Sequence, residues 1–502
     1  MQESAQQTFD LAVIGGGVNG AGIARDAAGR GLKVLLCERD DLGGATSSAS
    51  SKLIHGGLRY LEHYEFRLVR EALQEREVLL EVAPHLIRPL NFVLPHDAHL
   101  RPAWMIRAGL FLYDHLARRK TLAGSRGLDF AHDPAGRPLK PQFTRGFSYS
   151  DCWVDDARLV VLLAVDARER GAEILTRTPC TAARREGDAW TLALGAGPGK
   201  RRIRARALVN AGGPWVGDVL KRTLGRNDAP QPRLVKGSHI VVPRLYDGAH
   251  AYILQNRDRR IVFVIPYEQR FSLIGTTDVP FAGDPAGVAI SSEEKQYLCD
   301  AVGQWFHHPP KPADAVWHYA GVRPLFDDAS DDPSAVTRDY VLALEDEANL
   351  APLLSVYGGK ITTFRRLAEH ALEKLKPHFP AMKPAWTARA ALPGGDLGGK
   401  GFEAFQAGLA ARHSFLPAAL ALRLARAYGS RAERVLDGAR RLDDLGRDLG
   451  GGLHEREAEY LVREEFARSA KDILWRRSKL GLHAPTAART LSDWLRARGG
   501  AA

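Results

Sequence analysis

A glycine-rich turn near the start of the chain constrains the fold more than any other feature. An apolar run at residues 11–14 predicts a buried parallel strand, and an alanine-rich helix follows the turn. Gly15 permits the tight turn, Gly17 leaves room for a pyrophosphate at the helix N-terminus, and Gly20 lets helix and strand pack closely. A second apolar strand ends on Glu38, where an acidic side chain can reach a ribose hydroxyl. This order predicts a dinucleotide-binding domain, and Glu38 argues against the phosphorylated ribose of NADP.

Length and composition describe an ordinary globular protein. The chain has 502 residues, 45% of them hydrophobic, which is enough for two or three domains around a large core. The net charge of +11 suits an anionic partner, which could be a phosphorylated metabolite, a nucleic acid or an acidic lipid surface. The sequence has no Lys/Arg block and no repeated aromatic-basic pattern, so we expect no nucleic-acid binding.

The cysteines and the N-terminus indicate the compartment. Cys37, Cys152, Cys180 and Cys299 show no C-x-x-C spacing, so we expect reduced thiols and no metal site. The N-terminus lacks a basic region followed by an apolar one, so no secretory signal is predicted. No stretch reaches the roughly 18 apolar residues that span a bilayer, so any membrane contact is expected to be peripheral.

The remaining chain alternates helix and strand patterns. Helices are predicted at 66–82 (closed by Pro84), 102–120 (apolar, with basic residues at its end), 157–170 (capped by Asp155 or Asp156) and 364–375. Strands are predicted at 91–95, 172–178, 207–211 and 353–357, and an antiparallel sheet at 234–243 and 261–276. We expect a loop at 124–141 and a linker at 393–401, then helices to the end, with the charged run 455–468 on solvated faces.

Six separated segments carry a family resemblance that extends over essentially the whole chain. They are residues 46–66, 149–158, 236–242, 274–278, 320–324 and 355–363. Together they closely resemble FAD-dependent glycerol-3-phosphate dehydrogenase, the aerobic respiratory enzyme. Six motifs in the right order are far more specific than the glycine turn alone.

The resemblance implies an α/β fold like that of glycine oxidase and D-amino-acid oxidase. It comprises a doubly wound FAD-binding domain (about 8–90, 145–235 and 335–385), an interleaved antiparallel β-sheet substrate domain (about 91–144 and 236–334), and a C-terminal α-helical domain (386–502). The implied reaction oxidises sn-glycerol 3-phosphate to dihydroxyacetone phosphate. FAD takes the hydride at N5, and ubiquinone reoxidises the flavin at the cytoplasmic face of the inner membrane. A homodimer is also implied.

Two alternatives stay open at this point. An oxidase of the same fold would pass electrons to oxygen and release peroxide, and the matching residues do not distinguish the two. A non-catalytic flavoprotein is the alternative from another class. The helix expected at 102–120 could lie in an anionic lipid interface beside the quinone, but a plain buried helix fits nearly as well.

The reaction needs a base at the hydroxyl and cations at the phosphate. The base is His55 or His239, and the residues leave open which. Arg59, Arg323 and Arg338 are expected at the phosphate with Tyr60 and Thr276 as neutral donors, and Arg323 could also stabilise the developing alkoxide. Lys360 could bind the phosphate or the flavin.

The expected FAD contacts, none of them covalent, are Gly15, Gly17, Asn19, Gly20, Glu38, Thr46, Ser47, Ser48, Ser51, Lys52, Leu53, His55, Gly56, Gly57, Ala211, Gly212, Trp215, Gly358, Gly359, Lys360, Ile361 and Thr362.

Overall fold

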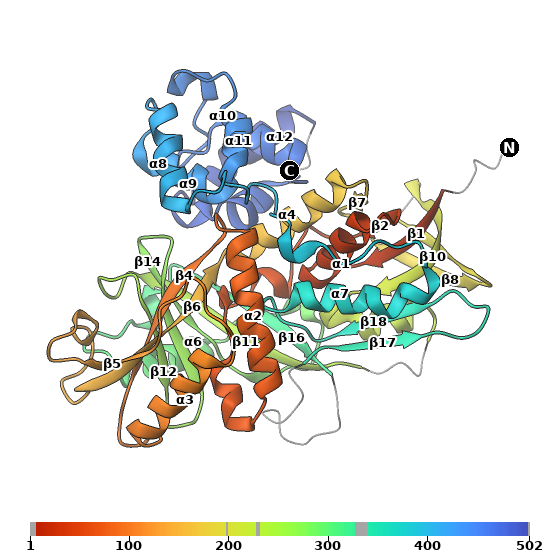
Figure 1. Cartoon of the computed structure of the whole chain (residues 1–502). Helices are drawn as coiled ribbons and strands as arrows, with labels where there is room; N and C mark the ends of the chain where they lie inside the picture. Colours follow the sequence, from red (N-terminus) through yellow and green to blue (C-terminus); the bar gives the residue numbers. More distant parts are fainter. Residues whose placement is uncertain (1–6, 197–198, 227–230, 327–338, 500–502) are drawn as a thin grey trace.

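Two β-sheets lie beside each other, and a lobe of helices packs on top of them (Figure 1). The computed structural model describes residues 7–196, 199–226, 231–326 and 339–499. None of the helices in these ranges is long and apolar enough to cross a bilayer.

The first sheet contains the glycine-rich turn. Five of its strands pair in parallel, and the other three add antiparallel pairs. In order, the strands are β17 (Val341–Glu345), β18 (Leu353–Tyr357), β10 (Arg201–Asn210), β1 (Thr8–Ile14), β2 (Val34–Cys37) and β7 (Glu173–Leu175), with β9 (Ala189–Leu194) beside β10 and β8 (Cys180–Glu186) beside β9. The doubly wound FAD-type sheet is confirmed.

Three helices pack together against this sheet. They are α1 (Val18–Gly29), α4 (Asp156–Glu169) and α7 (Phe364–Leu375). Asp155 caps α4 by accepting a hydrogen bond from the backbone N–H of Arg158 at 3.2 Å, which decides between the two capping candidates. Gly22 of α1 lies against Phe364 of α7, where a Cβ would come within 3.0 Å of the ring. The close packing expected of an alanine- and glycine-rich helix is therefore present.

The second sheet is mostly antiparallel, with one parallel pair between β4 and β12 that the pattern did not predict. Its strands are β15 (Val279–Pro280), β11 (Arg233–Pro243), β14 (Phe271–Gly275), β13 (Ile261–Tyr267), β12 (Ala251–Gln255), β4 (Ile87–Pro95), β6 (Arg145–Val154) and β3 (Leu53–Ile54), with β16 (Trp317–Leu325) beside β11 and β5 (Arg126–Asp129) beside β6. Three helices accompany it: α2 (Phe66–Val82), α3 (Ala103–His115) and α6 (Ser292–Gly303).

Several local predictions need correction. The stretch 124–141 is not all loop, because β5 pairs with β6. Helix α3 ends at His115, so Arg118, Arg119 and Lys120 follow the helix and do not lie in its last turn. Strands β3 and β6 fall in segments expected for the FAD-binding domain, yet they pair with each other in the second sheet. Strand β6 belongs to this sheet because it also pairs with β4 along the whole length of β4. The domain boundaries themselves stay a prediction.

The C-terminal helices form a lobe with its own apolar core. The lobe contains α8 (Phe402–Arg412), α9 (Ala418–Tyr428), α10 (Ala432–Leu436), α11 (Glu455–Glu464) and α12 (Ala487–Ala497). The expected helical domain is confirmed, but the charged run 455–468 is not fully solvated. Glu457 and Glu465 are buried, because each carboxylate pairs with an arginine, Arg423 and Arg158 respectively.

Candidate active site

Two adjoining cavities meet at the loop that follows β2. The first, of about 1000 Å³, runs along the glycine-rich turn, and we call it the nucleotide cavity. The second, of about 730 Å³, lies between the two sheets, and we call it the reaction cavity. Thr46, Ser47 and Ala49 line both. A ligand that lies along this loop can therefore extend from one cavity into the other.

The nucleotide cavity has the geometry of a pyrophosphate cradle. Gly15 has a φ of +108°, and a Cβ there would lie 2.4 Å from the carbonyl oxygen of Ala211. A Cβ on Gly20 would lie 1.9 Å from the carbonyl oxygen of Gly15, so only glycine fits the turn. The carboxylate of Glu38 accepts a hydrogen bond from the N–H of Gly16 at 2.6 Å and lines the cavity. The glycines leave the turn free of side chains, and Glu38 lies in the same cavity, an arrangement that fits a dinucleotide.

Asn19 provides an independent indication of a ligand. Its Nδ2 donates to the carbonyl of Gly358 at 3.1 Å, but its buried Oδ1 has no hydrogen-bond partner among the described residues. Gly359 has a φ of +96°, and a Cβ there would approach Asn19 Nδ2 to 2.8 Å. The unsatisfied oxygen and the close approach at Gly359 fit FAD extended from the first cavity toward the second.

Most of the residues predicted to bind FAD line one of the two cavities. In the nucleotide cavity these are Gly15, Gly17, Asn19, Glu38, Thr46, Ser47, Ser48, Ala211, Gly212, Trp215, Gly358 and Gly359. In the reaction cavity they are Ser51, Leu53, His55, Gly57, Lys360, Ile361 and Thr362. Gly20 and Gly56 line neither cavity. Gly20 allows close packing instead, and the N–H of Gly56 donates to Tyr113 Oη at 2.9 Å.

The prediction for Lys52 is corrected. Its ammonium is fully buried and donates to both carboxylate oxygens of Asp156, at 2.8 and 2.9 Å, and it lines neither cavity. A buried ammonium needs such a partner, which a neutral flavin edge would not supply. Lys52 therefore holds the loop to the start of α4.

His239 lies in the reaction cavity in the middle of β11. Its ring stacks on Tyr319 of β16, with centroids 4.7 Å apart, and its Nε2 lies 2.9 Å from Ser51 Oγ. On the other side the register pairs it with Gly275, where a Cβ would meet the His239 ring at 2.1 Å. Burial, reinforced by nearby Lys52 and Arg323, lowers the pKa of His239 to about 3. This imidazole is neutral at physiological pH.

His55 lies in the same cavity, and its backbone N–H donates to Thr362 Oγ1 at 3.3 Å. Burial lowers the pKa of His55, and nearby Lys360 and Arg76 lower it further, whereas the charge of Asp151 opposes the shift. Asp151 itself accepts hydrogen bonds from Arg76 at 2.7 Å and from Tyr113 at 2.8 Å. Asp151 therefore offsets part of the shift, and the net pKa of His55 stays below its ordinary value.

The predicted phosphate ligands gather in the reaction cavity. Arg59, Tyr60, Thr276, Arg323 and Lys360 all line it. Lys360 Nζ lies 4.1 Å from the centre of the Tyr60 ring, and Arg323 donates to the carbonyl of Thr277 at 3.0 Å. Arg338 lies outside the residues that the structure describes.

Sequence reasoning missed the groups that support this site. Asp151 lay inside a recognised motif but was not assigned a role, although a carboxylate two residues from each of two aromatic residues was a signal that could have indicated a buried network. Asp278, 3.4 Å from Arg323, likewise belongs to a recognised motif. Nothing in the sequence indicated that Trp475 contributes to the site. It lies in the C-terminal lobe, far from Trp317 along the chain, yet the two rings stack with their centroids 4.4 Å apart.

Comparison with known proteins agrees with this geometry. The model of the family "FAD dependent oxidoreductase" matches residues 10–365, and that of "C-terminal domain of alpha-glycerophosphate oxidase" matches residues 385–495. The chain is 60% identical to a glycerol-3-phosphate dehydrogenase of Pseudomonas aeruginosa over 95% of this chain and 92% of the relative. It is 55% identical to the aerobic glycerol-3-phosphate dehydrogenase of Escherichia coli over 97% of each. It is also 54% identical to a D-erythritol 1-phosphate dehydrogenase of Brucella abortus over 96% of each.

Solved structures confirm the fold. A glycerol-3-phosphate dehydrogenase from Bacillus halodurans, complexed with FAD, superposes with a TM-score of 0.78 at 25% identity, over 99% of this chain and 91% of that one. Glycine oxidase from Geobacillus kaustophilus superposes with a TM-score of 0.56 at 19% identity, over 77% and 98%. The chain is thus an enzyme that uses FAD, and it belongs to the FAD-dependent glycerol-3-phosphate dehydrogenase family.

Proposed function

We propose that this enzyme oxidises sn-glycerol 3-phosphate to dihydroxyacetone phosphate. The observation that carries the proposal is the convergence of two histidines and three cations, Arg59, Arg323 and Lys360, on one cavity that continues into the FAD cradle. A phosphate monoester carries close to two negative charges, which separated cations neutralise. An amino-acid substrate, with one carboxylate and one amine, would not need them.

The residues divide into a phosphate end and a reacting end. Arg323, placed by Thr277 and Asp278, and Lys360, placed over Tyr60, would hold the phosphate and orient C2. When bound, FAD accepts the hydride from C2. His55, with the charge of Asp151 behind it, would take the hydroxyl proton as the general base.

His239 has a different role in this proposal. Its pKa of about 3 makes it a poor proton acceptor at neutral pH, because burial and the cations Lys52 and Arg323 outweigh the opposing charge of Asp156. A neutral imidazole can still donate one hydrogen bond, so His239 would orient the C2 oxygen while Ser51 and Tyr319 hold its ring. We therefore propose His55 as the base and His239 as the orienting donor.

The relatives include enzymes named for two different polyol phosphates, so the substrate test compares both. Purified enzyme is given sn-glycerol 3-phosphate, its enantiomer, glycerol and D-erythritol 1-phosphate with an artificial electron acceptor. We expect the highest kcat/KM for sn-glycerol 3-phosphate, with dihydroxyacetone phosphate as product and no turnover of glycerol. A higher kcat/KM for D-erythritol 1-phosphate would reassign the substrate.

We further propose that ubiquinone in a membrane reoxidises the flavin. Support comes from exposed apolar side chains beside the reaction cavity. Tyr64, which lines the cavity, is 80% exposed, and Trp104 and Phe111, which are 70% and 57% exposed, lie on α3 next to Met105 and Leu112, which line it. Such a surface suits peripheral contact with lipid, from which a quinone could enter. Arg118 adds an exposed basic charge nearby, whereas Lys120 pairs with Glu81 at 3.1 Å.

The oxidase alternative makes a distinct prediction. An oxidase would release one peroxide per substrate oxidised in air, whereas the proposed dehydrogenase reduces a quinone analogue with little peroxide. Measuring both products in one reaction decides between them. The homodimer implied by the resemblance stays a prediction, which sedimentation of the purified protein tests.

A further inference from the structure

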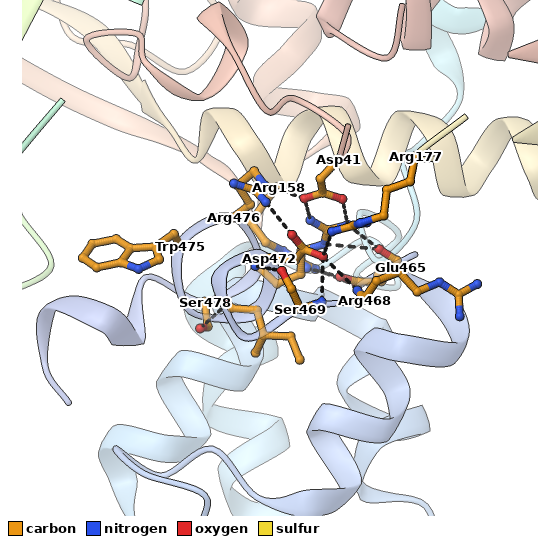
Figure 2. Close-up of polar contacts among 12 residues, drawn as sticks. Asp41, Arg158, Arg177, Glu465, Arg468, Ser469, Asp472, Trp475, Arg476 and Ser478 are labelled. Atoms are coloured by element: carbon orange, nitrogen blue, oxygen red, sulfur yellow. Dashed lines mark hydrogen bonds and ion pairs between the residues drawn. The ribbon is translucent and has the colours of Figure 1, made fainter. Parts of the chain in front are cut away.

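A buried set of ion pairs joins the C-terminal lobe to the loop that leads from the first sheet into the reaction cavity. We call residues 465–479 the clamp segment and residues 41–52 the cofactor loop. Figure 2 shows Asp41, Arg158 and Arg177 reaching from the sheet-bearing part of the chain toward Glu465, Asp472 and Arg476 of the lobe. The clamp segment includes a π-helical turn at Asp472–Arg477.

Asp41 anchors the start of the cofactor loop. Only 3% of this residue is exposed, and its carboxylate accepts hydrogen bonds from both Arg476 and Arg477. The Nη2 of Arg477 reaches the second oxygen of Asp41 at 2.8 Å and also donates to the carbonyl of Glu465 at 2.7 Å. A buried carboxylate with two charge-assisted partners has one well-defined position.

The position of Asp41 determines where the backbone beside the glycine-rich turn lies. The carbonyl of Asp41 accepts a hydrogen bond from the N–H of Gly44 at 3.0 Å, and the N–H of Gly43 donates to the carbonyl of Gly16 at 2.9 Å. Leu42, fully buried between them, lies so close to Gly16 that a Cβ there would come within 2.9 Å. Displacing Asp41 therefore displaces the backbone that forms the pyrophosphate cradle.

The far end of the cofactor loop is held through α4. Lys52 pairs with Asp156 at the first turn of α4, and Asp155 beside it lies 3.5 Å from Lys479 of the clamp segment. Arg158, one turn further along, donates to both oxygens of Glu465, to one of them at 2.9 Å. The clamp segment therefore holds both ends of the cofactor loop, the first through Asp41 and the second through α4.

Asp472 keeps the clamp arginines in place. It accepts hydrogen bonds from Arg476 at 2.5 Å, from Arg177 at 2.6 Å and from the N–H of Arg468 at 2.8 Å. Burial alone would raise the pKa of Asp472, but these N–H and guanidinium groups lower it to about 2. The carboxylate stays ionised throughout the physiological range.

We propose that the clamp segment of the C-terminal lobe holds the cofactor loop in the conformation that binds FAD. Arg477 is the decisive positioning residue, because it is fully buried, lines neither cavity and reaches the cofactor loop through Asp41. A loop that is already ordered loses less entropy when FAD binds, so the clamp increases affinity. By linkage, bound FAD must stabilise the docking of the clamp to the same extent.

The first test measures FAD affinity. FAD is removed from the full chain, and its dissociation constant is determined from flavin fluorescence for the parent, Arg477→Met and Arg477→Lys. We expect Arg477→Met to weaken FAD about 10-fold or more, and Arg477→Lys, which keeps the charge, to weaken it less. The matched control is Glu457→Gln, which breaks the buried 2.6 Å pair with Arg423 inside the same lobe and should change affinity less than about 2-fold.

The second readout separates positioning from general stability. Hydrogen exchange is measured by mass spectrometry on the parent with and without FAD. We expect FAD to slow exchange in the clamp segment 465–479 but not in α8, which is remote from the cofactor loop. If Arg477→Met does not fold, the proposal is tested by the FAD affinity of Arg477→Lys and by the difference in exchange that FAD causes in the parent. The proposal is overturned if Arg477→Met folds and binds FAD within about 2-fold of the parent, or if FAD leaves exchange in the clamp segment unchanged.

Discussion

The Oγ of Ser51 lies 2.9 Å from Nε2 of His239. Ser51 belongs to the cofactor loop that leaves the first sheet, and His239 lies mid-strand in the second, so this contact joins the FAD cradle to the substrate side of the cavity. Because His239 is neutral, the ring can exchange one hydrogen bond with Ser51 or with a substrate hydroxyl without a change of charge. The contact shows how a conformational change in the loop would reach the reacting end.

The two histidines should differ in their kinetic effects. We expect His55→Gln to lower kcat by about 10²- to 10⁴-fold and to remove the loss of activity toward acidic pH, because it deletes the base. His239→Gln keeps a hydrogen-bond donor and should lower kcat less, with the acid limb retained. Steady-state pH profiles of both variants check this. A larger loss of kcat with His239→Gln than with His55→Gln would mean that His239 is the base and His55 the orienting residue.

Gly275 should be required for the position of His239. A Cβ at residue 275 would lie 2.1 Å from the imidazole, so Gly275→Ala must push the ring away from Ser51. We expect kcat to fall at least about 10-fold while the flavin content stays that of the parent. Gly127→Ala is the matched control, because a Cβ there meets nothing within 4 Å. Unchanged kcat in Gly275→Ala would mean that His239 is not needed where it lies.

Acid should destabilise the chain through His85. Burial, together with nearby arginines, lowers the pKa of His85 from its ordinary 6.5 to about 3. Between these values the unfolded chain binds a proton that the folded chain does not, so stability falls as the pH falls from 6.5 toward 3. The slope from one histidine is at most about 1.4 kcal/mol per pH unit. Urea unfolding of the FAD-free chain at pH 7 and pH 5 should show a smaller loss for His85→Leu than for the parent, and equal losses would contradict the assignment.

The exposed apolar side chains of α3 should carry the membrane contact. Replacing Trp104 and Phe111 with serine should move the protein from sedimenting lipid vesicles to the supernatant without loss of dye-linked activity. Val316→Ser removes an exposed apolar side chain elsewhere and should leave sedimentation unchanged. The triple change of Arg118, Arg119 and Lys120 to glutamate tests the basic part separately. Vesicle binding that survives both sets of changes would exclude this surface.

The sequence predicted the parts of the fold that depend on local pattern. Helices α2 and α7 have the predicted bounds, because Pro84 ends the first and the glycine pair at 358–359 precedes the second. The glycine-rich turn and Glu38 were found because each has a fixed spacing in a βαβ unit. Strand β6 was missed as a strand, since a ten-residue run with buried serine, aspartate and cysteine lacks simple alternation.

The long-range contacts could not be predicted from local pattern. Asp41 and Arg477 are 436 residues apart, and nothing near either one indicates the other. Lys52 lay in a cofactor motif, so spacing suggested a ligand contact where the structure has an ion pair with Asp156. The spacing of motif residues along the sequence indicates which backbone segments lie together. The direction of a side chain depends instead on the partner that tertiary packing places beside it.

The most direct test of the proposed chemistry is anaerobic reduction of the bound flavin. Enzyme with its FAD is mixed with sn-glycerol 3-phosphate in the absence of oxygen, and the flavin absorbance is followed. We expect complete bleaching by this substrate and none by glycerol or by the enantiomer, with Arg323→Ala needing about 10- to 100-fold more substrate. A flavin that stays oxidised, or that bleaches equally with glycerol, would contradict the assignment of the reaction cavity to a phosphorylated polyol.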